Sequence, residues 1–415
     1  MTDEPTECPS SEQNDLNYHV AILHQKFRKK HEDRYIIDMA VALKERNKMV
    51  SIFTTGFDQG KTLENILPLK DSIYEFGDWI PPSVCGYFRK YMTFLRLLWL
   101  TIRLILHPQK PTPDLIILDT PSFVLFFLHI FTRYKKFYIH HFPHLRHADL
   151  YHQNMLVLSD LPTIKTISYA DEILIETKCL QKVFEQSFPQ AKKTFLLSPT
   201  YETGLWDAKT IDIRRIVPDL PRNHKLFVAF GDYKLSSNFM VILEALEEMT
   251  TFTSQNLKEE IHVVIAGNYR RECAGHYDEL IQKTKGKIFA SQVTFLKQLP
   301  TVHKKTLLKA CTALIHLVKH DLYPRSIIPA IGMGKPIITV DRGFNSTILT
   351  HRISAIFVEA DAYKLAVVMT KIANSSTLKT FLSNMARGVY ASEFTFKIFG
   401  DKLNSLCTKY ASGRV

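Results

Sequence analysis

Apolar and polar positions follow two alternating periods along the first half of the chain. Short apolar runs bounded by polar residues are typical of buried strands, and they occur at Tyr18–Leu23, Met49–Thr54, Leu115–Asp119, Phe137–His140, Glu172–Ile175 and Thr194–Ser198. Stretches with a helical period, such as Tyr35–Glu45 and Cys179–Phe188, separate several of these runs. This alternation predicts a parallel sheet with helices on both faces.

The same pattern begins again in the second half of the chain. The expected strands are Lys225–Phe230, His262–Ala266, Val293–Phe295, Ala313–Leu317, Ile337–Val340 and Ala355–Val358. Residues 199–222 are irregular and proline-rich, so we interpret them as a linker. The sequence therefore predicts two doubly wound, Rossmann-like α/β domains facing across a ligand cleft, residues 18–198 and 223–395, followed by a C-terminal helix and tail, 396–415.

Length and composition agree with two domains. A chain of 415 residues that is 46% hydrophobic can bury two cores. Residues 1–17 are acidic without an apolar segment, which predicts a disordered tail rather than a signal peptide. The cysteines form no close pair, so we expect reduced thiols in the cytosol and neither disulfides nor a zinc site; they are Cys8, Cys85, Cys179, Cys273, Cys311 and Cys407.

The charge pattern suggests an anionic partner. The net charge of +12 favours a polyanion or an anionic surface, although no run is long enough to span a bilayer. The apolar run Phe123–Phe131 is expected in the core. Residues 87–107 predict an amphipathic helix with Arg89, Arg96 and Arg103 on one side and Trp99 among its apolar residues. Such a helix suits the headgroup region of an anionic membrane, or alternatively a core contact with three solvated arginines.

Several motifs occur in a collinear order from His24 to the final helix. They are His24 with Arg34 and Asp38, Gly77-Asp78-Trp79-Ile80-Pro81, His141-Phe142-Pro143, Asp171–Pro189, Tyr233 with Asn238, Ala266-Gly267, Val293–Leu296 and Gly334-Lys335-Pro336. In this order they resemble family 4 retaining glycosyltransferases of the GT-B fold. Within that family they are most similar to the α-1,3/1,6-mannosyltransferases that build the dolichol-linked oligosaccharide for protein glycosylation.

The resemblance implies a set of functional expectations. The donor would be a GDP-mannose-like nucleotide sugar, used without a metal cofactor. The acceptor would be a lipid-linked oligosaccharide or another glycan. The protein would bind an anionic membrane surface and work at the cytosolic face of the endoplasmic reticulum.

The donor loop of the first domain departs from the family. Members carry two glycines after the first strand, whose bare backbone approaches the diphosphate. Lys30 and His31 occupy the matching positions here. The basic residues of this loop could replace the backbone donors with positive charge, or they could form an ordinary solvated loop.

The second domain departs from the family at its leaving-group site. The family's arginine and lysine neutralise the departing diphosphate, but this chain has Asp232 in place of the arginine and Ser236-Ser237 in place of basic residues. Lys234 is a nearby cation in a different register. An acidic side chain at this place would repel a diphosphate.

The family's Glu-x7-Glu pair is altered as well. Asp321 takes the first position, where a shorter side chain displaces the carboxylate by about 1 Å. Pro329 takes the second position, where its side chain cannot bind the ribose but the first turns of a helix tolerate it. Arg325 is a nearby cation that could meet a phosphate or belong to the surface.

The acceptor side keeps the family's histidine. His141 matches the motif residue near the acceptor and could orient a hydroxyl or donate a hydrogen bond; it could equally be a strand-end histidine bonded to the backbone. A metal site with His140 and His144 is disfavoured, because adjacent strand residues point to opposite faces. Asp321 and His141 are thus the candidate catalytic residues.

Other classes of function fit less well. No motif or aromatic platform for nucleic-acid binding is present, and no GxGxxG follows the first strand, which excludes a nucleotide-dependent oxidoreductase. Two readings stay open: a membrane-attached glycosyltransferase with altered donor chemistry, and an inactive paralogue that acts as a partner or regulator of glycosylation.

Overall fold

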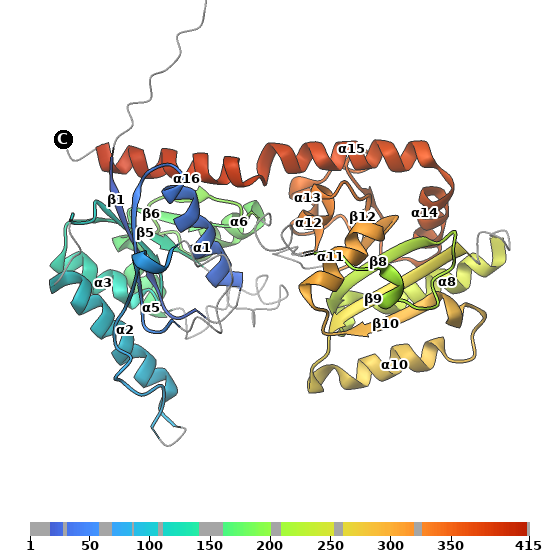
Figure 1. Ribbon diagram of the computed structural model, residues 1–415, viewed down its shortest axis with the longest axis horizontal. Coiled ribbons are helices and arrows are strands. Elements are labelled where there is room, and N and C mark those ends of the chain that lie inside the picture. Colours follow the sequence, from blue (N-terminus) through green and yellow to red (C-terminus); the bar gives the residue numbers. More distant parts are fainter. Residues whose placement is uncertain are drawn as a thin grey trace, which may run out of the picture.

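A computed structural model of the chain describes residues 17–27, 31–57, 69–84, 87–106, 111–140, 161–200, 209–252, 260–318 and 326–412. In this part of the chain the first domain contains a seven-stranded parallel sheet with the order β3-β2-β1-β4-β5-β6-β7 (Figure 1). Its strands are β1 His19–His24, β2 Met49–Thr54, β3 Ile73–Glu75, β4 Leu115–Asp119, β5 Lys135–Ile139, β6 Glu172–Ile175 and β7 Thr194–Leu196.

The second domain repeats this architecture. Its described residues form a six-stranded parallel sheet with the order β10-β9-β8-β11-β12-β13. The strands are β8 Lys225–Asp232, β9 Ile261–Asn268, β10 Val293–Lys297, β11 Ala313–His316, β12 Ile337–Thr339 and β13 Ile356–Phe357. In both sheets the first strand of the domain lies inside the sheet and the order reverses beside it, which is the doubly wound topology that the sequence predicted.

Helices bury an apolar core on each face of both sheets. In the first domain these helices are α1 His31–Lys44, α2 Arg89–Leu106, α3 Phe123–Phe131, α5 Leu161–Thr166, α6 Lys178–Ser187 and α16 Phe396–Ala411. In the second domain they are α8 Phe239–Phe252, α10 Ala274–Thr284, α11 Thr301–Ala310, α12 Ile327–Gly332, α13 Asn345–Ile348, α14 Ala362–Asn374 and α15 Ser376–Glu393.

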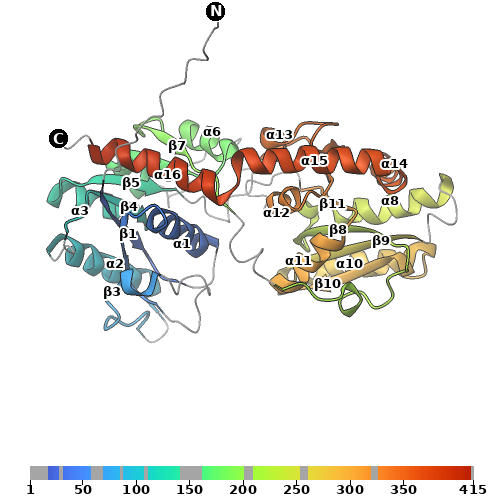
Figure 2. The ribbon, with the colours of Figure 1, turned by 45° about the horizontal axis from the view of Figure 1, so that its top comes forward.

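The last two helices link the domains. In two views α15 runs along the second domain and α16 continues along the first (Figures 1 and 2). Phe399, Leu403 and Cys407 of α16 are buried in the core of the first domain. Asn404 accepts a 2.7 Å hydrogen bond from the Tyr18 hydroxyl. The chain therefore returns at its end to complete the domain with which it begins.

Most of the expected strands are confirmed, and Met49–Thr54, Leu115–Asp119 and Glu172–Ile175 have the predicted bounds. Strand β3 was not anticipated. Residues 213–220 do not behave as a linker, because Ile216, Val217 and Leu220 are buried in the core of the second domain. The four cysteines within the described ranges are free thiols.

Candidate functional site

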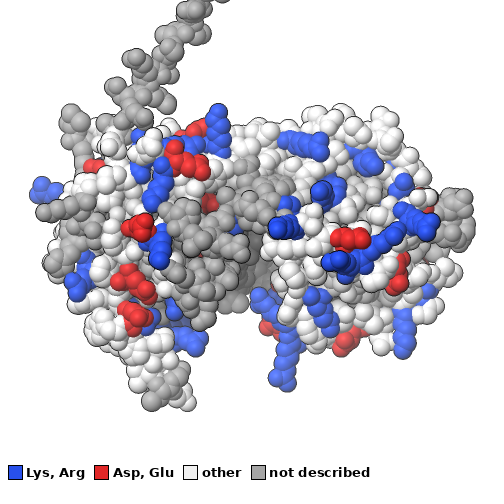
Figure 3. All heavy atoms as spheres, in the orientation of Figure 1, with Lys and Arg blue, Asp and Glu red and all other residues white. Residues whose placement is uncertain are grey.

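The candidate site is sought at the carboxyl ends of both sheets, where the structure describes Lys234 among the predicted donor residues. On the face shown in Figure 3, a hollow separates the two domains and Lys and Arg side chains of the second domain lie beside it. Ligands of doubly wound domains bind at these strand ends. The site therefore follows from the last residues of β1, β4, β5, β8 and β11 and from what they contact.

A buried cluster of ionisable residues lies at the carboxyl ends of two strands of the first domain. His24 ends β1 and its Nδ1 lies 2.5 Å from Oδ2 of Asp119, which ends β4, while its Nε2 lies 3.1 Å from Oδ1 of Asp33 on α1. Burial alone would lower the pKa of His24. The hydrogen bonds and charges of the two carboxylates outweigh that effect and raise the pKa to about 9. The imidazolium thus joins the start of α1 to two strands at neutral pH.

Of the first domain's predicted site residues, Lys30 and His31 lie close to Asp33 in the sequence. Lys30 and His141 fall outside the described residues, and His31 is described only as the first residue of α1. The neighbouring His140 follows β5 and is buried, with its ring 4.8 Å from that of Phe184. It is therefore a core histidine, and the roles of Lys30, His31 and His141 stay predictions.

The second domain presents a neutralised pair where the family has two cations. Asp232 ends β8, and its Oδ1 accepts a 2.9 Å hydrogen bond from Nδ2 of Asn268 at the end of β9. Its Oδ2 lies 3.6 Å from Nζ of Lys234. Lys234, a candidate donor-binding residue, therefore shares its charge with an adjacent carboxylate. This strand end offers little net positive charge to a diphosphate.

The backbone beneath this pair is tightly constrained. The Tyr233 hydroxyl donates 2.9 Å hydrogen bonds to the carbonyl groups of Ile265 and Leu296, so it ties the ends of β9 and β10 together. A Cβ on Gly267 would lie 2.8 Å from the Gly231 carbonyl oxygen, closer than any side chain tolerates. Only glycine fits at this position, which explains the Ala266-Gly267 motif.

The altered carboxylate pair lies partly outside the described ranges. Asp321 and Arg325 belong to residues 319–325, about which the structure says nothing. Pro329 is the third residue of α12 and is buried, so the helix tolerates it as expected. Its buried ring provides no acceptor for a ribose hydroxyl.

Sequence reasoning missed two polar groups at these strand ends. Asn345 Nδ2 donates a 2.8 Å hydrogen bond to the Thr339 hydroxyl, which donates in turn to the His316 carbonyl at 2.8 Å. Lys297 ends β10, with Nζ 3.8 Å from the ring centroid of Tyr269 and 3.9 Å from that of Tyr277. His316 lies 23 residues from Thr339 in the sequence, and the rings that contact Lys297 come from another segment, so no local pattern marks these contacts. Within the described ranges, no group of His, Cys, Asp and Glu is placed to hold a metal ion.

The expectation that three arginines share the exposed side of α2 is wrong for Arg96. Arg96 is only 7% exposed, and its Nε donates a 2.6 Å hydrogen bond to the carbonyl of Ile80. It therefore anchors the Gly77–Pro81 segment against the helix. Arg103 lies over the Trp99 ring, 5.1 Å from its centroid, whereas Arg89 is exposed.

The prediction that Phe123–Phe131 lies in the core is only partly correct. Phe126, Ile130 and Phe131 of α3 are 42%, 54% and 62% exposed. Through Phe123, whose ring centroid lies 4.6 Å from that of Phe94, α3 adjoins α2. We define the aromatic surface as seven of the exposed apolar residues of these two helices and the turn before α2: Tyr87, Phe88, Tyr91, Phe94, Phe126, Ile130 and Phe131. None of the described helices combines the length and apolar character needed to cross a bilayer.

Comparison with known proteins finds a family match in the second domain and similar proteins over most of the chain. Residues 212–388 match the family described as "Glycosyl transferases group 1". The human α-1,3/1,6-mannosyltransferase ALG2 is 25% identical over 94% of this chain and 95% of its own length. The Dictyostelium discoideum enzyme of the same name is 24% identical over 96% of this chain and 99% of its own. The chain is thus similar to these mannosyltransferases over most of its length.

Solved structures place this chain in the GT-B fold, as predicted. Anabaena HepE in complex with UDP matches with a TM-score of 0.69 at 14% identity, covering 94% of this chain and 100% of its own. A Rickettsia africae glycosyltransferase matches with a TM-score of 0.70 at 12% identity, covering 95% and 98%. At these identities the likeness establishes the fold alone.

Proposed function

We propose that the protein transfers a hexosyl residue, mannosyl by resemblance, from a nucleotide sugar to a lipid-linked glycan at the cytosolic face of the endoplasmic reticulum. The observation that carries this proposal is the resemblance to α-1,3/1,6-mannosyltransferases over almost the whole chain, including both domains. Relatives that shared only the fold would not support it, since doubly wound domains serve many functions.

The geometry supports a donor site with weakened electrostatics. The ends of β8 and β9 keep the constrained backbone of a ligand-binding edge through Tyr233 and Gly267. Stabilising a leaving diphosphate requires cations aimed at it, and Asp232 already engages Lys234. A transferase built this way would bind its donor weakly and depend more on other contacts.

The aromatic surface supports the proposed attachment to a membrane. Exposed rings on α2 and α3 would enter the headgroup region, and the exposed Arg89, Lys90 and Arg133 would meet anionic lipids. The first domain, which by resemblance takes the acceptor, would then face the bilayer that carries a lipid-linked glycan.

A second candidate function is an inactive paralogue that regulates or assists glycosylation. The Asp232–Lys234 pair and the buried Pro329 favour this alternative, because each removes a donor contact without disturbing the fold. The fold and both cores persist. Binding and rescue experiments separate the two functions.

We expect the wild-type protein to bind GDP-mannose weakly and a variant with restored family residues to bind it more tightly. Asp232→Arg with Ser236→Lys adds two cations at the end of β8, where charge-assisted bonds should raise affinity by about tenfold or more. Adding Pro329→Glu should raise it further if α12 stays folded. Calorimetric titration measures the affinities.

The control for this test is the single substitution Asp278→Arg, at an exposed position of α10. It adds an arginine to the same domain away from the strand ends and should leave affinity unchanged. Micromolar binding by the wild type, or no gain in the restored double variant, would contradict the assignment of Asp232 to a weakened donor site.

We expect Asp321→Ala and His141→Ala each to abolish rescue of cells that lack the protein, if it is a transferase. These residues match the family's acid and acceptor-side histidine, so turnover should depend on both. Circular dichroism of each purified variant checks that it is folded. Full rescue by both folded variants would rule out the enzymatic function and favour the paralogue.

A further inference from the structure

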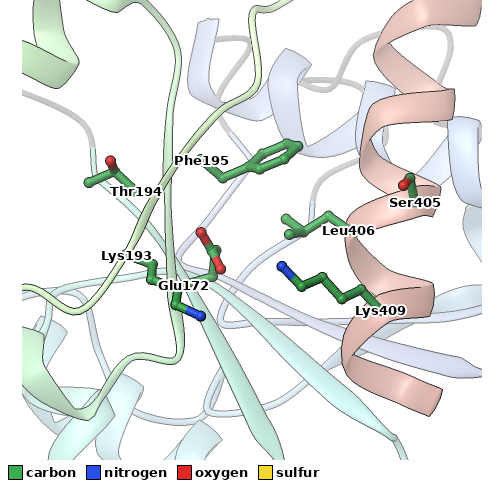
Figure 4. A pocket seen from close by; sticks show the side chains of 7 residues that line it. All are labelled: Glu172, Lys193, Thr194, Phe195, Ser405, Leu406 and Lys409. Carbon is green, nitrogen blue, oxygen red and sulfur yellow. The ribbon is translucent and has the colours of Figure 1, made fainter. Parts of the chain in front are cut away.

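A pocket of about 490 Å³ lies in the first domain, at the amino ends of the strands. Residues from the edge of the sheet and from α16 line it (Figure 4): Glu172, Lys193, Thr194, Phe195, Ser405, Leu406 and Lys409. Glu172 begins β6 and Thr194 begins β7. The pocket is therefore at the opposite end of the sheet from the strand ends that hold the donor and acceptor candidates.

A buried carboxylate forms the inner part of this pocket. Glu172 is buried, and one of its oxygens, Oε2, accepts a 2.5 Å hydrogen bond from the hydroxyl of Tyr410 on α16. Burial raises the pKa of Tyr410, and the hydrogen bond to Glu172 raises it further. Tyr410 thus remains a neutral donor that fixes one oxygen, whereas no hydrogen bond from a described residue occupies Oε1.

Two lysines stand at the mouth of the pocket. Lys193 and Lys409 are exposed and belong to segments that meet only through the tertiary fold, the turn before β7 and the last turn of α16. Among the described residues, neither side chain forms an ion pair within 4.0 Å. In Figure 4 the Lys409 ammonium points toward the space over Glu172, which has apolar walls in Phe195 and Leu406.

We propose that this pocket binds a small polyol phosphate. The phosphate lies between Lys193 and Lys409, where two ammonium groups neutralise it. A hydroxyl of the ligand donates a hydrogen bond to Oε1 of Glu172, and its carbon skeleton contacts Phe195 and Leu406. Inorganic phosphate fits less well, because it has no spacer between its charge and the group that would reach the repelling carboxylate, and no carbon skeleton to contact Phe195 and Leu406.

This ligand chemistry could come from a soluble sugar or polyol phosphate or from a phospholipid headgroup. Either ligand would bridge the sheet edge and α16, and would therefore stabilise the C-terminal helix on the first domain. The site is separate from the donor site, so it can be present whether or not the protein transfers a sugar.

Calorimetric titration of the full-length protein with sn-glycerol 3-phosphate, inorganic phosphate and glycerol tests the proposal. We expect glycerol 3-phosphate to bind several-fold more tightly than phosphate, and glycerol not to bind. Lys193→Glu with Lys409→Glu should weaken glycerol 3-phosphate binding by about a hundredfold, about tenfold for each lost charge-assisted contact. The matched control Lys182→Glu with Lys397→Glu changes net charge equally at exposed sites on α6 and α16 outside the pocket.

Glu172→Gln tests the inner contact, because glutamine keeps an acceptor for the Tyr410 hydroxyl without the charge. This variant should bind inorganic phosphate more tightly than wild type does and lose most of the preference for glycerol 3-phosphate. Equal affinities of the wild type for the two ligands, or binding that survives in the Lys193→Glu, Lys409→Glu variant, would overturn the proposal.

Sedimentation with phosphatidylcholine vesicles, with and without phosphatidylinositol, identifies the source of the ligand. If the ligand is a headgroup, the two lysine substitutions should reduce binding to phosphatidylinositol vesicles relative to the matched control. If the ligand is soluble, these substitutions should weaken glycerol 3-phosphate binding but leave vesicle binding equal to the control.

Discussion

Replacing His24 by glutamine is expected to lower the free energy of unfolding of the first domain by about 3 kcal/mol at neutral pH. The substitution replaces the imidazolium between Asp33 and Asp119 by a neutral amide, which removes a positive charge from beside two buried carboxylates. Breaking a buried ion pair on one side is costly, because the remaining charge loses its partner without regaining water. Urea unfolding followed by tryptophan fluorescence reports on Trp79 and Trp99 in this domain.

The pH dependence provides a sharper signature of the same cluster. The pKa of His24 is raised in the folded protein to about 9 from an ordinary value of 6.5. The stabilisation is therefore complete below pH 6.5 and is lost as the pH rises through about 9. Within this window the unfolding free energy of wild type should fall by roughly 1.4 kcal/mol per pH unit, up to about 3 kcal/mol in total.

The glutamine variant should lack this dependence, since its amide does not titrate. His303→Gln on α11 is a control that removes a histidine from the second domain. It should leave the pH dependence of the first domain unchanged. A wild-type curve that is flat between pH 7 and 9, or one that His24→Gln reproduces, would contradict a charged His24.

Strands were the most predictable part of the fold. Leu115–Asp119 and Glu172–Ile175 are buried on both sides in parallel sheets, so their residues read as short apolar runs with definite ends. Strand β3, Ile73–Glu75, is a short edge strand with half-exposed residues and carries too weak a pattern. The return of α16 to the first domain depends on tertiary contacts such as that of Tyr18 with Asn404, which no local pattern contains.

The sequence predicted less well which residues of a helix are buried and which are exposed, for a physical reason. The spacing of Arg89, Arg96 and Arg103 fixes their angular positions on α2 but not what covers them. The carbonyl groups of Asp78 and Ile80 lie over Arg96 and bury it. Conversely, α3 is apolar apart from His129, so its sequence gives little signal for which side faces solvent, and Phe126, Ile130 and Phe131 are exposed along with His129.

At the candidate site, too, the sequence motifs located residues but did not predict their contacts. Sequence resemblance located Asp232, and the structure adds that Asn268 and Lys234 engage it. His24 was noticed as one element of the resemblance, but its partner Asp119 is 95 residues away along the chain. The two meet only because β1 and β4 are neighbours in the sheet. Candidate chemistry at Asp321 and His141 rests on resemblance alone.

Replacing Phe126, Ile130 and Phe131 together by serine is expected to release the protein from membranes. These side chains are exposed on α3, so the substitutions should leave the core of the first domain intact. If each loses about 1 kcal/mol of apolar transfer into the headgroup region, the membrane partition coefficient should fall by about a hundredfold. Sedimentation with vesicles of endoplasmic reticulum composition, and fractionation of cells, both measure this release.

Two comparisons show which interaction holds the protein at the membrane. Arg89→Glu with Lys90→Glu should weaken binding by about tenfold or more at low salt and less at high salt, since charges near an anionic surface contribute about 1 kcal/mol each. Phe381→Ser with Met385→Ser removes exposed apolar side chains from α15 on the second domain and should change nothing. If the α3 variant sediments like wild type while remaining folded, the aromatic surface binds something other than lipid. A protein partner on the first domain would then be the better explanation, and the paralogue function would gain support over a transferase held at the bilayer.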